Sequence, residues 1–436
     1  MPDQLYIESL AYTGAGLGYL PDGKVVFVQG GLPGDRVSIE LNVQKRRYAT
    51  AQLVELLEPG PRRVPATCDL AGICGGCPWQ CLEYPEQLHW KRSFVVDALK
   101  RIGKVADAEQ LVQAINASEK IWNYRNKVEF STVSKNGRLS LGKHPLNSTE
   151  LVEVKRCHLL PKPFVDLPKQ IAGTLNYAVS QEPVKPYRVG FRHSVRTGIS
   201  ELALWSTPSG MRRSFVAQLL TDAMKLDSLV RVLTRNQDSE RKVVKTEVLS
   251  GRGHWVEELS TRRLMISAPS FFQVNTPVAE AMVAKVLAIA EPADKQIWDL
   301  YCGAGSFTLP LAAAGAEVSA VEIAGSALRD LRRNLDAFAL DEHVEVYSGD
   351  VGRALSELEP AHLAVLDPPR AGLSTTVVNQ LLASAPEQLV YVSCDPQTLA
   401  RDIAYLAAGG YQLLAAYPFD LFPQSYHVET IAHLKR

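Results

Sequence analysis

A cysteine stands at the end of one short apolar run and directly before a segment that opens like a helix. Residues 389–393, LVYVS, predict a buried strand, Cys394 follows it, and Asp395 and Pro396 lead into TLARD. Free cysteines are most often small buried residues. A thiol on a strand-to-helix turn can also meet a ligand, and its thiolate is a nucleophile. Cys394 is therefore a candidate for covalent catalysis.

Four acidic residues end other predicted strands of the same region. The runs QIWDL, EVSAVE, VEVYS and LAVLD alternate with helical patterns within residues 267–436. This alternation predicts a doubly wound, largely parallel sheet, in which ligands bind at the carboxyl ends of the strands. Because strand ends share one edge, we expect a site there that includes Cys394. The four acids are Asp299, Glu322, Asp350 and Asp367.

The loop YCGAGSF after the first of these strands indicates which ligand binds. Gly303 and Gly305 allow a tight turn and a close approach of the backbone. Glu322 ends the next strand, where an acid can bind ribose hydroxyls. A dinucleotide loop would have a further glycine where Thr308 stands, so NAD is disfavoured. S-adenosylmethionine, a nucleoside without pyrophosphate, fits better, and Asp350 is placed to meet its adenine.

A second group of cysteines lies near the N-terminal third of the chain. Cys68, Cys74 and Cys77 have the spacing C-x5-C-x2-C, and Cys157 follows in KRCHLL. The sequence shows neither a signal-peptide pattern nor a long apolar run, so we expect a cytoplasmic protein with no membrane association and reduced cysteines. Clustered reduced cysteines suggest metal binding or catalysis, and zinc accepts four thiolates. A redox pair in CGGC is disfavoured because no βαβ pattern surrounds it.

Composition and the positions of turn-forming residues divide the chain into three regions. It has 436 residues, of which 46% are hydrophobic and 22% charged, as in ordinary soluble proteins. We expect a small β-barrel over residues 1–58, a central β-rich domain over 66–266 and the α/β domain over 267–436. Within the central region a helical pattern runs over 93–116, a segment that we expect to pack on the α/β domain.

Net charge argues weakly against a nucleic-acid partner, because 47 basic residues balance 47 acidic ones. Basic residues nevertheless cluster locally, in residues 42–65 and 185–198. A strand through YRVGFRHS would place Arg188 and Arg192 on one face. Local patches of this kind can bind phosphates at zero net charge.

Four segments together resemble the RNA uracil-C5 methyltransferases. They are DLYCGAGSFTL, LDPPRAG, VSCDPQTLARD and DLFPQSYHVET, and the resemblance extends over the whole chain. The N-terminal region resembles a TRAM domain, an OB-like barrel. The barrel together with the cysteine group is most similar to the bacterial members of the family that methylate 23S ribosomal RNA. The resemblance implies a Rossmann-like methyltransferase domain that uses S-adenosylmethionine.

The resemblance also implies roles for individual residues. Cys394 would add to C6 of uracil and Glu429, in HVET, would remove the C5 proton. Asp367 and Arg370 are candidates for holding the uracil edge, and we interpret Cys302 as loop packing. The family often has asparagine where Ser306 stands, which weakens the cofactor-binding role that the resemblance implies for Ser306. The implied cofactor-binding residues are Gln273, Tyr301, Ser306, Glu322, Asp350 and Asp367.

For the cysteine group, the resemblance implies a four-iron, four-sulfur cluster with a structural role in shaping an RNA-binding surface. Its ligands would be Cys68, Cys74, Cys77 and Cys157. Cys81 stands where relatives often have histidine, which leaves an alternative ligand open.

RNA is the expected partner, with 23S ribosomal RNA first and the T-loop uridine of transfer RNA second. A catalytically idle, iron–sulfur RNA-binding module is the alternative from another class. The expected contact surface is the barrel, the Lys45–Arg47 stripe, residues 122–127 and the arginine strand 188–196. We expect a monomer without an obligate protein partner.

Overall fold

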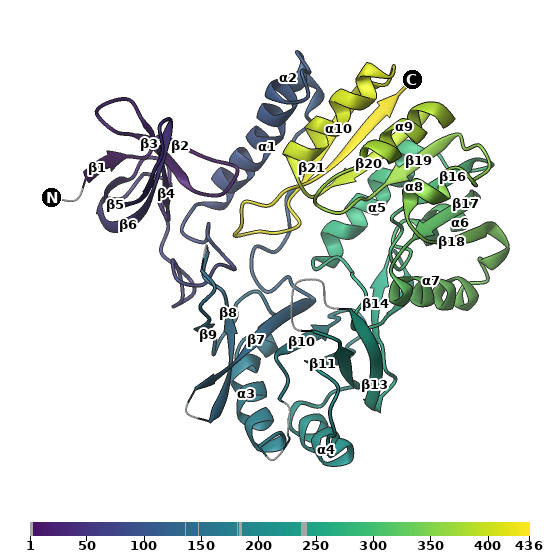
Figure 1. Ribbon diagram of the computed structural model, residues 1–436, viewed down its shortest axis with the longest axis horizontal. Helices are drawn as coiled ribbons and strands as arrows, with labels where there is room; N and C mark the ends of the chain where they lie inside the picture. The colour runs from purple at the N-terminus through teal and green to yellow at the C-terminus, as the bar shows by residue number, and fades with distance from the viewer. Residues whose placement is uncertain (1–2, 136, 147, 181, 183–184, 237–241) are drawn as a thin grey trace.

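The computed structural model describes residues 3–436 except 136, 147, 181, 183–184 and 237–241. Figure 1 shows a small β unit on the left, a central sheet at the bottom and an α/β domain on the right. The first unit is a six-stranded sheet with the order β1-β5-β6-β4-β3-β2. The chain leaves β1 at one edge of this order and enters β2 at the other, and Glu8 N donates a hydrogen bond to Leu17 O of β3, so the sheet curls into a barrel. Its strands are β1 (Asp3–Tyr6), β2 (Ser9–Leu10), β3 (Gly16–Tyr19), β4 (Val25–Gln29), β5 (Arg36–Gln44) and β6 (Tyr48–Glu58).

The central unit is a seven-stranded sheet with two helices on one face. Its order is β13-β12-β11-β10-β7-β8-β9, and α3 (Leu167–Ala178) and α4 (Arg213–Met224) pack on it through an apolar core. The hairpin of β14 (Trp255–Leu259) and β15 (Arg262–Ile266) then leads into the α/β domain. The sheet strands are β7 (Lys127–Lys135), β8 (Arg138–Lys143), β9 (Val152–Glu153), β10 (Arg188–His193), β11 (Ser200–Ser206), β12 (Ser228–Thr234) and β13 (Val243–Gly251).

The prediction that the arginine strand contacts RNA is wrong for Arg192. Arg192, on β10, is buried and donates hydrogen bonds to the backbone carbonyls of Ser267 and Ser270. Arg188 is half-buried and pairs with Glu129 on the neighbouring strand at 2.7 Å. The two arginines lie on one face, as predicted, and protein covers that face at Arg192. Arg192 is therefore a structural cation, and RNA contact at Arg188 stays a prediction.

Of residues 122–127 only Tyr124 and Asn126 are buried and the others are half-buried, so the RNA contact predicted for this segment stays a prediction. Both of its cations do have partners within the protein. The Arg125 guanidinium lies 5.6 Å from the ring centroid of Phe422. Lys127 pairs with Glu129 at 3.0 Å, and burial lowers the pKa of Lys127 to about 8. By contrast, Lys45, Arg46 and Arg47 are exposed at the turn between β5 and β6.

The C-terminal unit confirms the predicted doubly wound sheet. Its order is β18-β17-β16-β19-β20-β22-β21, with the first five strands parallel and β22 inserted antiparallel between β20 and β21. Strands such as β19 are buried along their whole length, as expected when helices cover both faces. The strands are β16 (Gln296–Leu300), β17 (Glu317–Glu322), β18 (Val344–Ser348), β19 (Leu363–Leu366), β20 (Gln388–Ser393), β21 (Gln412–Phe419) and β22 (Glu429–Lys435).

Two apolar layers hold the helices on this sheet. One layer contains residues of α5 (Thr276–Ala290), α6 (Thr308–Ala313) and α7 (Gly325–Ala337). The other contains residues of α8 (Val351–Ala354), α9 (Thr375–Ser384) and α10 (Pro396–Ala408) together with α1 (Tyr84–Arg101). The helix α1 precedes the central unit in the sequence but lies beside α10 in the fold (Figure 1).

The helical pattern predicted over residues 93–116 differs from the structure at both ends. The helix α1 already begins at Tyr84, with Pro85 in its first turn, where a proline loses no hydrogen bond. The short helix α2 (Ala108–Leu111) follows. Residues 112–116 are then extended, because Val112 and Asn116 form parallel bridges with β21. Edge pairing with a distant strand overrides the local helical pattern there.

One buried ion pair joins α1 to the segment after β21. Lys91 Nζ lies 2.5 Å from Asp420 Oδ1, and both side chains are fully buried. Replacing Lys91 with methionine would leave the Asp420 carboxylate buried without its cation. We expect Lys91→Met to lower the free energy of unfolding by about 3–5 kcal/mol. Urea unfolding of the variant measures this change.

Lys100→Met is the matched control for this prediction. Lys100 is also on α1, but it pairs with Glu109 at the surface, where both side chains are exposed. We expect its effect to stay within about 0.5 kcal/mol. Equal effects of the two substitutions would contradict the role assigned to the buried pair.

Candidate active site

The glycine loop after β16 forms the first wall of the site. Tyr301, Gly303 and Gly305 all have positive φ values, of 66°, 59° and 94°. A Cβ on Gly303 would meet no atom within 4 Å, whereas one on Gly305 would lie 2.7 Å from Leu331. Gly305 is thus required by packing against α7. Gly303 leaves an open backbone surface that a ligand can approach.

Glu322, at the end of β17, fastens this loop to the start of α7. Its Oε2 accepts a hydrogen bond from Gly303 N at 3.0 Å, and its Oε1 accepts from Ile323 N and Ala324 N. A carboxylate has about four acceptor sites, so one remains for a ligand hydroxyl. Ile323 is 69% exposed beside it. The pair offers a hydrogen-bond acceptor and an apolar surface, which suits a nucleoside.

The nucleophile candidate lies on the turn between β20 and α10. Asp395, the residue after Cys394, caps α10 by accepting hydrogen bonds from Gln397 N and Thr398 N, and Pro396 occupies the first helical turn. This is the sequence rule for a helix start, and it explains why the strand ends here. Cys394 is therefore held at the carboxyl edge of the sheet and is half-buried.

Glu429 reaches Cys394 through the pairing of β22 with β20. Ser393 and Thr430 are partners in this antiparallel register, so the residues beside them, Cys394 and Glu429, meet at the same edge. Glu429 is 4% exposed. Burial raises the pKa of its carboxyl to about 8, and the nearby Asp367 adds to this.

The thiol and the carboxyls influence one another across the site. Burial, together with Glu429 and Asp367, raises the pKa of Cys394 to about 12, and Arg370 acts against this increase. Burial also raises the pKa of Asp367 to about 7, with contributions from Asp299 and Glu322. Asp299, Glu322 and Asp367, predicted from strand ends, therefore lie close enough to influence one another.

The buried acid Glu429 gives a prediction for stability. Its folded pKa of about 8 lies above the ordinary 4.5, so the native state keeps a proton that the unfolded chain releases between these values. The free energy of unfolding should therefore fall as pH rises across this window. We expect Glu429→Gln to have a larger free energy of unfolding than the parent near pH 8. Below the ordinary pKa of a glutamate carboxyl, the two free energies of unfolding should be equal. Urea unfolding at a series of pH values measures this, with the exposed Glu387→Gln as control.

Gln273 lies on a segment that other parts of the fold hold in place. Its Oε1 atom is buried and has no hydrogen-bond partner among the described residues, as expected of an atom that awaits a ligand. Its backbone carbonyl accepts a hydrogen bond from Asn126 of the central unit. Asp330 on α7 accepts from Ser267 and Ser270 of the same segment.

The remaining predicted cofactor residues are distributed along the same edge. Asp350 is exposed directly before α8, and together with Asp402 it raises the pKa of Tyr301, which burial already raises, to about 12. Ser306 is half-buried in the glycine loop. The edge thus brings together Tyr301, Glu322, Asp350 and Asp367.

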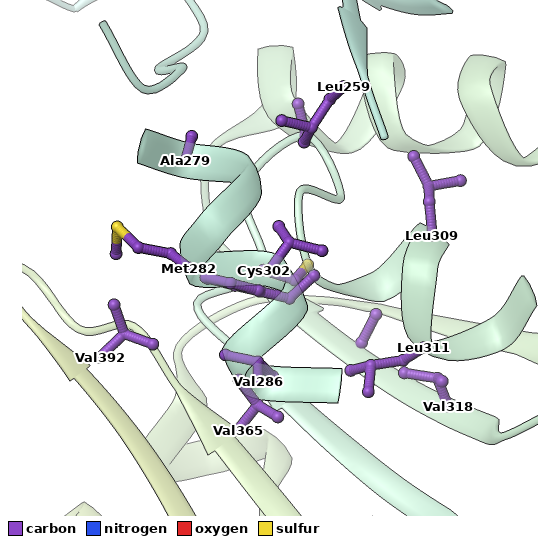
Figure 2. Packing of buried hydrophobic residues seen from close by; sticks show 14 of the residues in the cluster. Leu259, Ala279, Met282, Val286, Cys302, Leu309, Leu311, Val318, Val365 and Val392 are labelled. Atoms are coloured by element: carbon purple, nitrogen blue, oxygen red, sulfur yellow. The ribbon is translucent and has the colours of Figure 1, made fainter. Parts of the chain in front are cut away.

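Cys302 points into the protein interior (Figure 2). It is 5% exposed and packs in the cluster that includes Met282, Val365 and Leu309. Burial raises the pKa of its thiol well above the usual value. These contacts agree with the interpretation of Cys302 as loop packing.

The four clustered cysteines line a single small cavity. Its volume is about 50 Å³, and its walls include Arg125 and Lys143. Two cations facing several thiols suit an anionic centre. No group of three or more His, Cys, Asp or Glu side chains that could hold a metal ion occurs in the described part of the chain. The iron–sulfur cluster stays a prediction. The cysteines in the cavity wall are Cys68, Cys74, Cys77 and Cys157.

Two contacts that hold parts of the candidate site have no signal in the sequence. Tyr12 of the barrel donates a hydrogen bond to Asp395 across 383 residues of chain. Asn126 of the central unit contacts the Gln273 segment across 147 residues. No periodicity or motif links such distant residues, and only the fold reveals them.

Comparison with known proteins agrees with this fold and site. A family model described as tRNA (Uracil-5-)-methyltransferase matches residues 216–347 and 352–436, and a model of the TRAM domain matches residues 5–54. An uncharacterized RNA methyltransferase of Thermosynechococcus vestitus is 34% identical, over 99% of this chain and 97% of its own. Another, from Caldanaerobacter subterraneus, is 32% identical over 99% of this chain and 98% of its own.

A solved structure matches along the entire chain. The crystal structure of Pyrococcus abyssi tRNA (uracil-54, C5)-methyltransferase in complex with S-adenosyl-L-homocysteine has a TM-score of 0.76, 25% identity and full coverage of both chains. The fold, the site and these matches define an RNA methyltransferase. The chain belongs to the RNA uracil-5-methyltransferase family, and its N-terminal barrel is a TRAM domain.

This membership overturns the alternative of a catalytically idle binding module.

In the part of the chain that the structure describes, every helix is too short or too polar to cross a membrane.

Proposed function

We propose that this enzyme methylates C5 of a uracil in 23S ribosomal RNA and forms 5-methyluridine through a covalent adduct with Cys394. The observation that carries the proposal is the approach of the Cys394 thiol to the buried Glu429 carboxyl at the ligand-binding edge of the sheet. A nucleophile and a base in one site are what substitution at an unreactive ring carbon requires.

The reaction needs both residues because C5 of uracil is a weak nucleophile. The Cys394 thiolate forms a bond to C6, and the electron pair of the C5–C6 double bond moves onto C5 and O4. C5 would then form a bond to the methyl group of S-adenosylmethionine as the bond between that methyl group and the sulfonium sulfur breaks, with S-adenosylhomocysteine as the leaving group. Glu429, as a carboxylate, takes the C5 proton. The double bond forms again as the bond between C6 and sulfur breaks, which releases Cys394 as a thiolate.

Arg370 and Asp367 are the groups we assign to the uracil. Arg370 is exposed at the site, and its positive charge lowers the pKa of Cys394 against the effect of burial. It can also stabilise the negative charge that develops on the ring. Burial raises the pKa of Asp367 to about 7, so a protonated form is populated near neutral pH. In that state it can donate a hydrogen bond to a uracil oxygen.

For S-adenosylmethionine we assign Gln273 to the methionine end and Glu322 to the ribose. The unpartnered Oε1 of Gln273 and the acceptor site left on Glu322 support these assignments. Ile323 offers an apolar surface to the adenine, and Asp350 lies at the same edge. Tyr301 and Ser306 belong to the loop that closes this side.

We also propose that the cysteine-lined cavity holds a four-iron, four-sulfur cluster. Cysteine thiolates are the usual ligands of such clusters. The support is the shared cavity and the two cations in its wall, Arg125 and Lys143, which would balance the negative charge of a thiolate-bound cluster. When bound, the cluster would cross-link the loop of residues 68–77 to Cys157. We assign it a structural role.

Transfer RNA is the second candidate substrate. The observation that favours it is the likeness, at a TM-score of 0.76, to the Pyrococcus abyssi enzyme whose name specifies uracil 54 of tRNA. Either RNA must present an unpaired or flipped uracil, because a thiol does not reach C6 inside a helix. The exposed stripe Lys45–Arg47 is the part of the predicted contact surface that we retain for phosphates.

Tritium release from RNA labelled at uracil C5 tests the proposal. The enzyme and S-adenosylmethionine are added to unmodified 23S RNA and, separately, to unmodified tRNA, each with Cys394→Ala as control. We expect release from 23S RNA that requires Cys394. Release from tRNA alone would identify tRNA as the substrate in place of 23S RNA and would leave the proposed reaction at C5 unchanged. Release by Cys394→Ala at the parental rate would overturn the covalent mechanism.

A further inference from the structure

A loop of the TRAM barrel projects from the barrel and packs beside the turn between β20 and α10 that carries Cys394. This loop, residues 11–15, connects β2 to β3. The carbonyl of Gly14 accepts a hydrogen bond from the Trp79 indole at 3.1 Å. Gly14 has a φ of 82°, and a Cβ there would lie 2.3 Å from the ring of Tyr426. The loop therefore approaches the segment before β22 as closely as a backbone can.

An apolar cluster fixes this docking. Leu10 and Leu32 of the barrel pack with Trp79, Leu82 and Phe94, so the cluster joins the barrel, the cysteine-rich segment and α1. Since its members come from three parts of the chain, the barrel is held against the catalytic domain by buried apolar surface, which favours one orientation.

Tyr12 is the side chain that this docking carries to the catalytic turn. Its hydroxyl donates a hydrogen bond to Asp395 Oδ2 at 3.2 Å and also interacts with Arg370. Its ring makes edge contacts with Phe94 and Tyr426, with centroid distances of 5.7 Å and 6.4 Å. The ring is thus held on two sides, and the hydroxyl bridges two charged residues.

Both partners of Tyr12 act directly on Cys394. Asp395 follows Cys394 in the chain and sets the start of α10 through its Oδ1 atom. Its Oδ2 lies 3.5 Å from Arg370 Nε, and Arg370 is a positive group that faces the thiol. A hydroxyl that holds Asp395 and Arg370 therefore controls the orientation of the turn and the charge beside its sulfur.

We propose that Tyr12 is a positioning residue for Cys394, so that the TRAM barrel completes the catalytic centre in addition to contacting RNA. The inference rests on the proposed role of Cys394 as nucleophile. It predicts that loss of one barrel hydroxyl changes the reactivity of a thiol in another domain.

Several charged groups face the thiol besides those that Tyr12 touches. Glu429 on β22 and Asp367 after β19 disfavour the thiolate, and Arg370 favours it. His427, before β22, has a pKa lowered to about 4 by burial and by the nearby Arg370, so it is neutral at ordinary pH. Without the Tyr12 hydroxyl, the Asp395 carboxylate loses a hydrogen-bond donor, and the exposed Arg370 loses one of the contacts that hold it. Asp395 then acts more strongly against the thiolate and Arg370 less strongly in its favour.

Tyr12→Phe tests the inference because it removes the hydroxyl and keeps the ring contacts. We follow alkylation of Cys394 by iodoacetamide over a pH series, by mass spectrometry of its peptide, together with steady-state methylation of RNA. We expect alkylation and kcat to fall by about 3- to 10-fold, the net strength of one ordinary hydrogen bond. The pH profile of alkylation should move to higher pH, and KM for RNA should not change. Tyr177→Phe, an exposed tyrosine on α3, is the matched control.

The outcomes separate the inference from the proposed function. A Tyr12→Phe variant with the parental alkylation profile and kcat overturns the inference, even where Cys394→Ala is inactive. A rise in KM for RNA at constant kcat and alkylation also overturns it, because Tyr12 would then serve RNA binding only. If Cys394→Ala still transfers methyl groups, the proposed function fails, whereas the alkylation profile continues to report whether Tyr12 controls the thiol.

Discussion

RNA is expected to remain covalently attached to the enzyme when Glu429 is replaced by glutamine. Cys394 can still add to C6 and the methyl group can still be transferred, but the amide does not accept the C5 proton. The adduct therefore has no route to elimination. We expect turnover to fall by about 100- to 10,000-fold, the usual contribution of a general base. Labelled RNA that migrates with the protein on a denaturing gel measures the trapped species.

Two variants serve as controls for this result. Cys394→Ala should also be inactive but should form no adduct, and the double variant should behave in the same way. Glu387→Gln changes an exposed glutamate directly before β20 and should turn over normally. A Glu429→Gln enzyme that turns over at the parental rate, or that stalls without any adduct, would remove Glu429 from the role of base.

Loss of one cavity cysteine is the second large effect that we expect. Cys77→Ser removes a proposed ligand of the cluster, and its half-buried thiol lies near Cys157 and Cys74. Burial raises the pKa of that thiol to about 12. Without the proposed cluster, the loop of residues 68–77 would lose its link to Cys157. We expect a colourless protein that is less stable than the parent by more than about 4 kcal/mol. Visible absorption, iron content and urea unfolding of anaerobically purified protein measure these changes.

Cys81→Ser is the matched control for the cluster. Cys81 packs with Trp79 and Leu82. It is not among the described residues that line the cysteine cavity. We therefore expect its replacement to leave the colour and iron content unchanged. A colourless parental protein that contains zinc would overturn the cluster assignment, and loss of iron in Cys81→Ser would make Cys81 a ligand.

The α/β domain could be predicted from the sequence because its signals are local. Each strand is a short apolar run that ends in a polar residue, and parallel strands place such ends at one edge. The acids Glu322 and Asp367 could be grouped with Cys394 on this basis alone. The roles of Cys394 and Glu429 needed the family resemblance, because no spacing rule links residues on two different strands.

The arginine strand shows where local signals fail. Alternation correctly placed Arg188 and Arg192 on one face of β10, but it carried no information about what covers that face. The partners of Arg192 are carbonyl groups 74 to 78 residues away in the chain. The hydroxyl of Tyr12 presents the same difficulty. Contacts between domains depend on how the domains pack, which periodicity does not encode.

The position of α1 has a consequence for how the chain is made. Its apolar residues, such as Val95 and Leu99, pack with α10, and Lys91 pairs with Asp420 across 329 residues. The central unit is thus inserted between two parts of one domain. During synthesis on the ribosome, α1 emerges long before the strands that cover it, and its apolar face stays open until translation ends. We therefore expect the nascent α1 to be exposed to aggregation during synthesis, and residues 267–436 made alone would lack α1 from the layer that α8, α9 and α10 form on one sheet face.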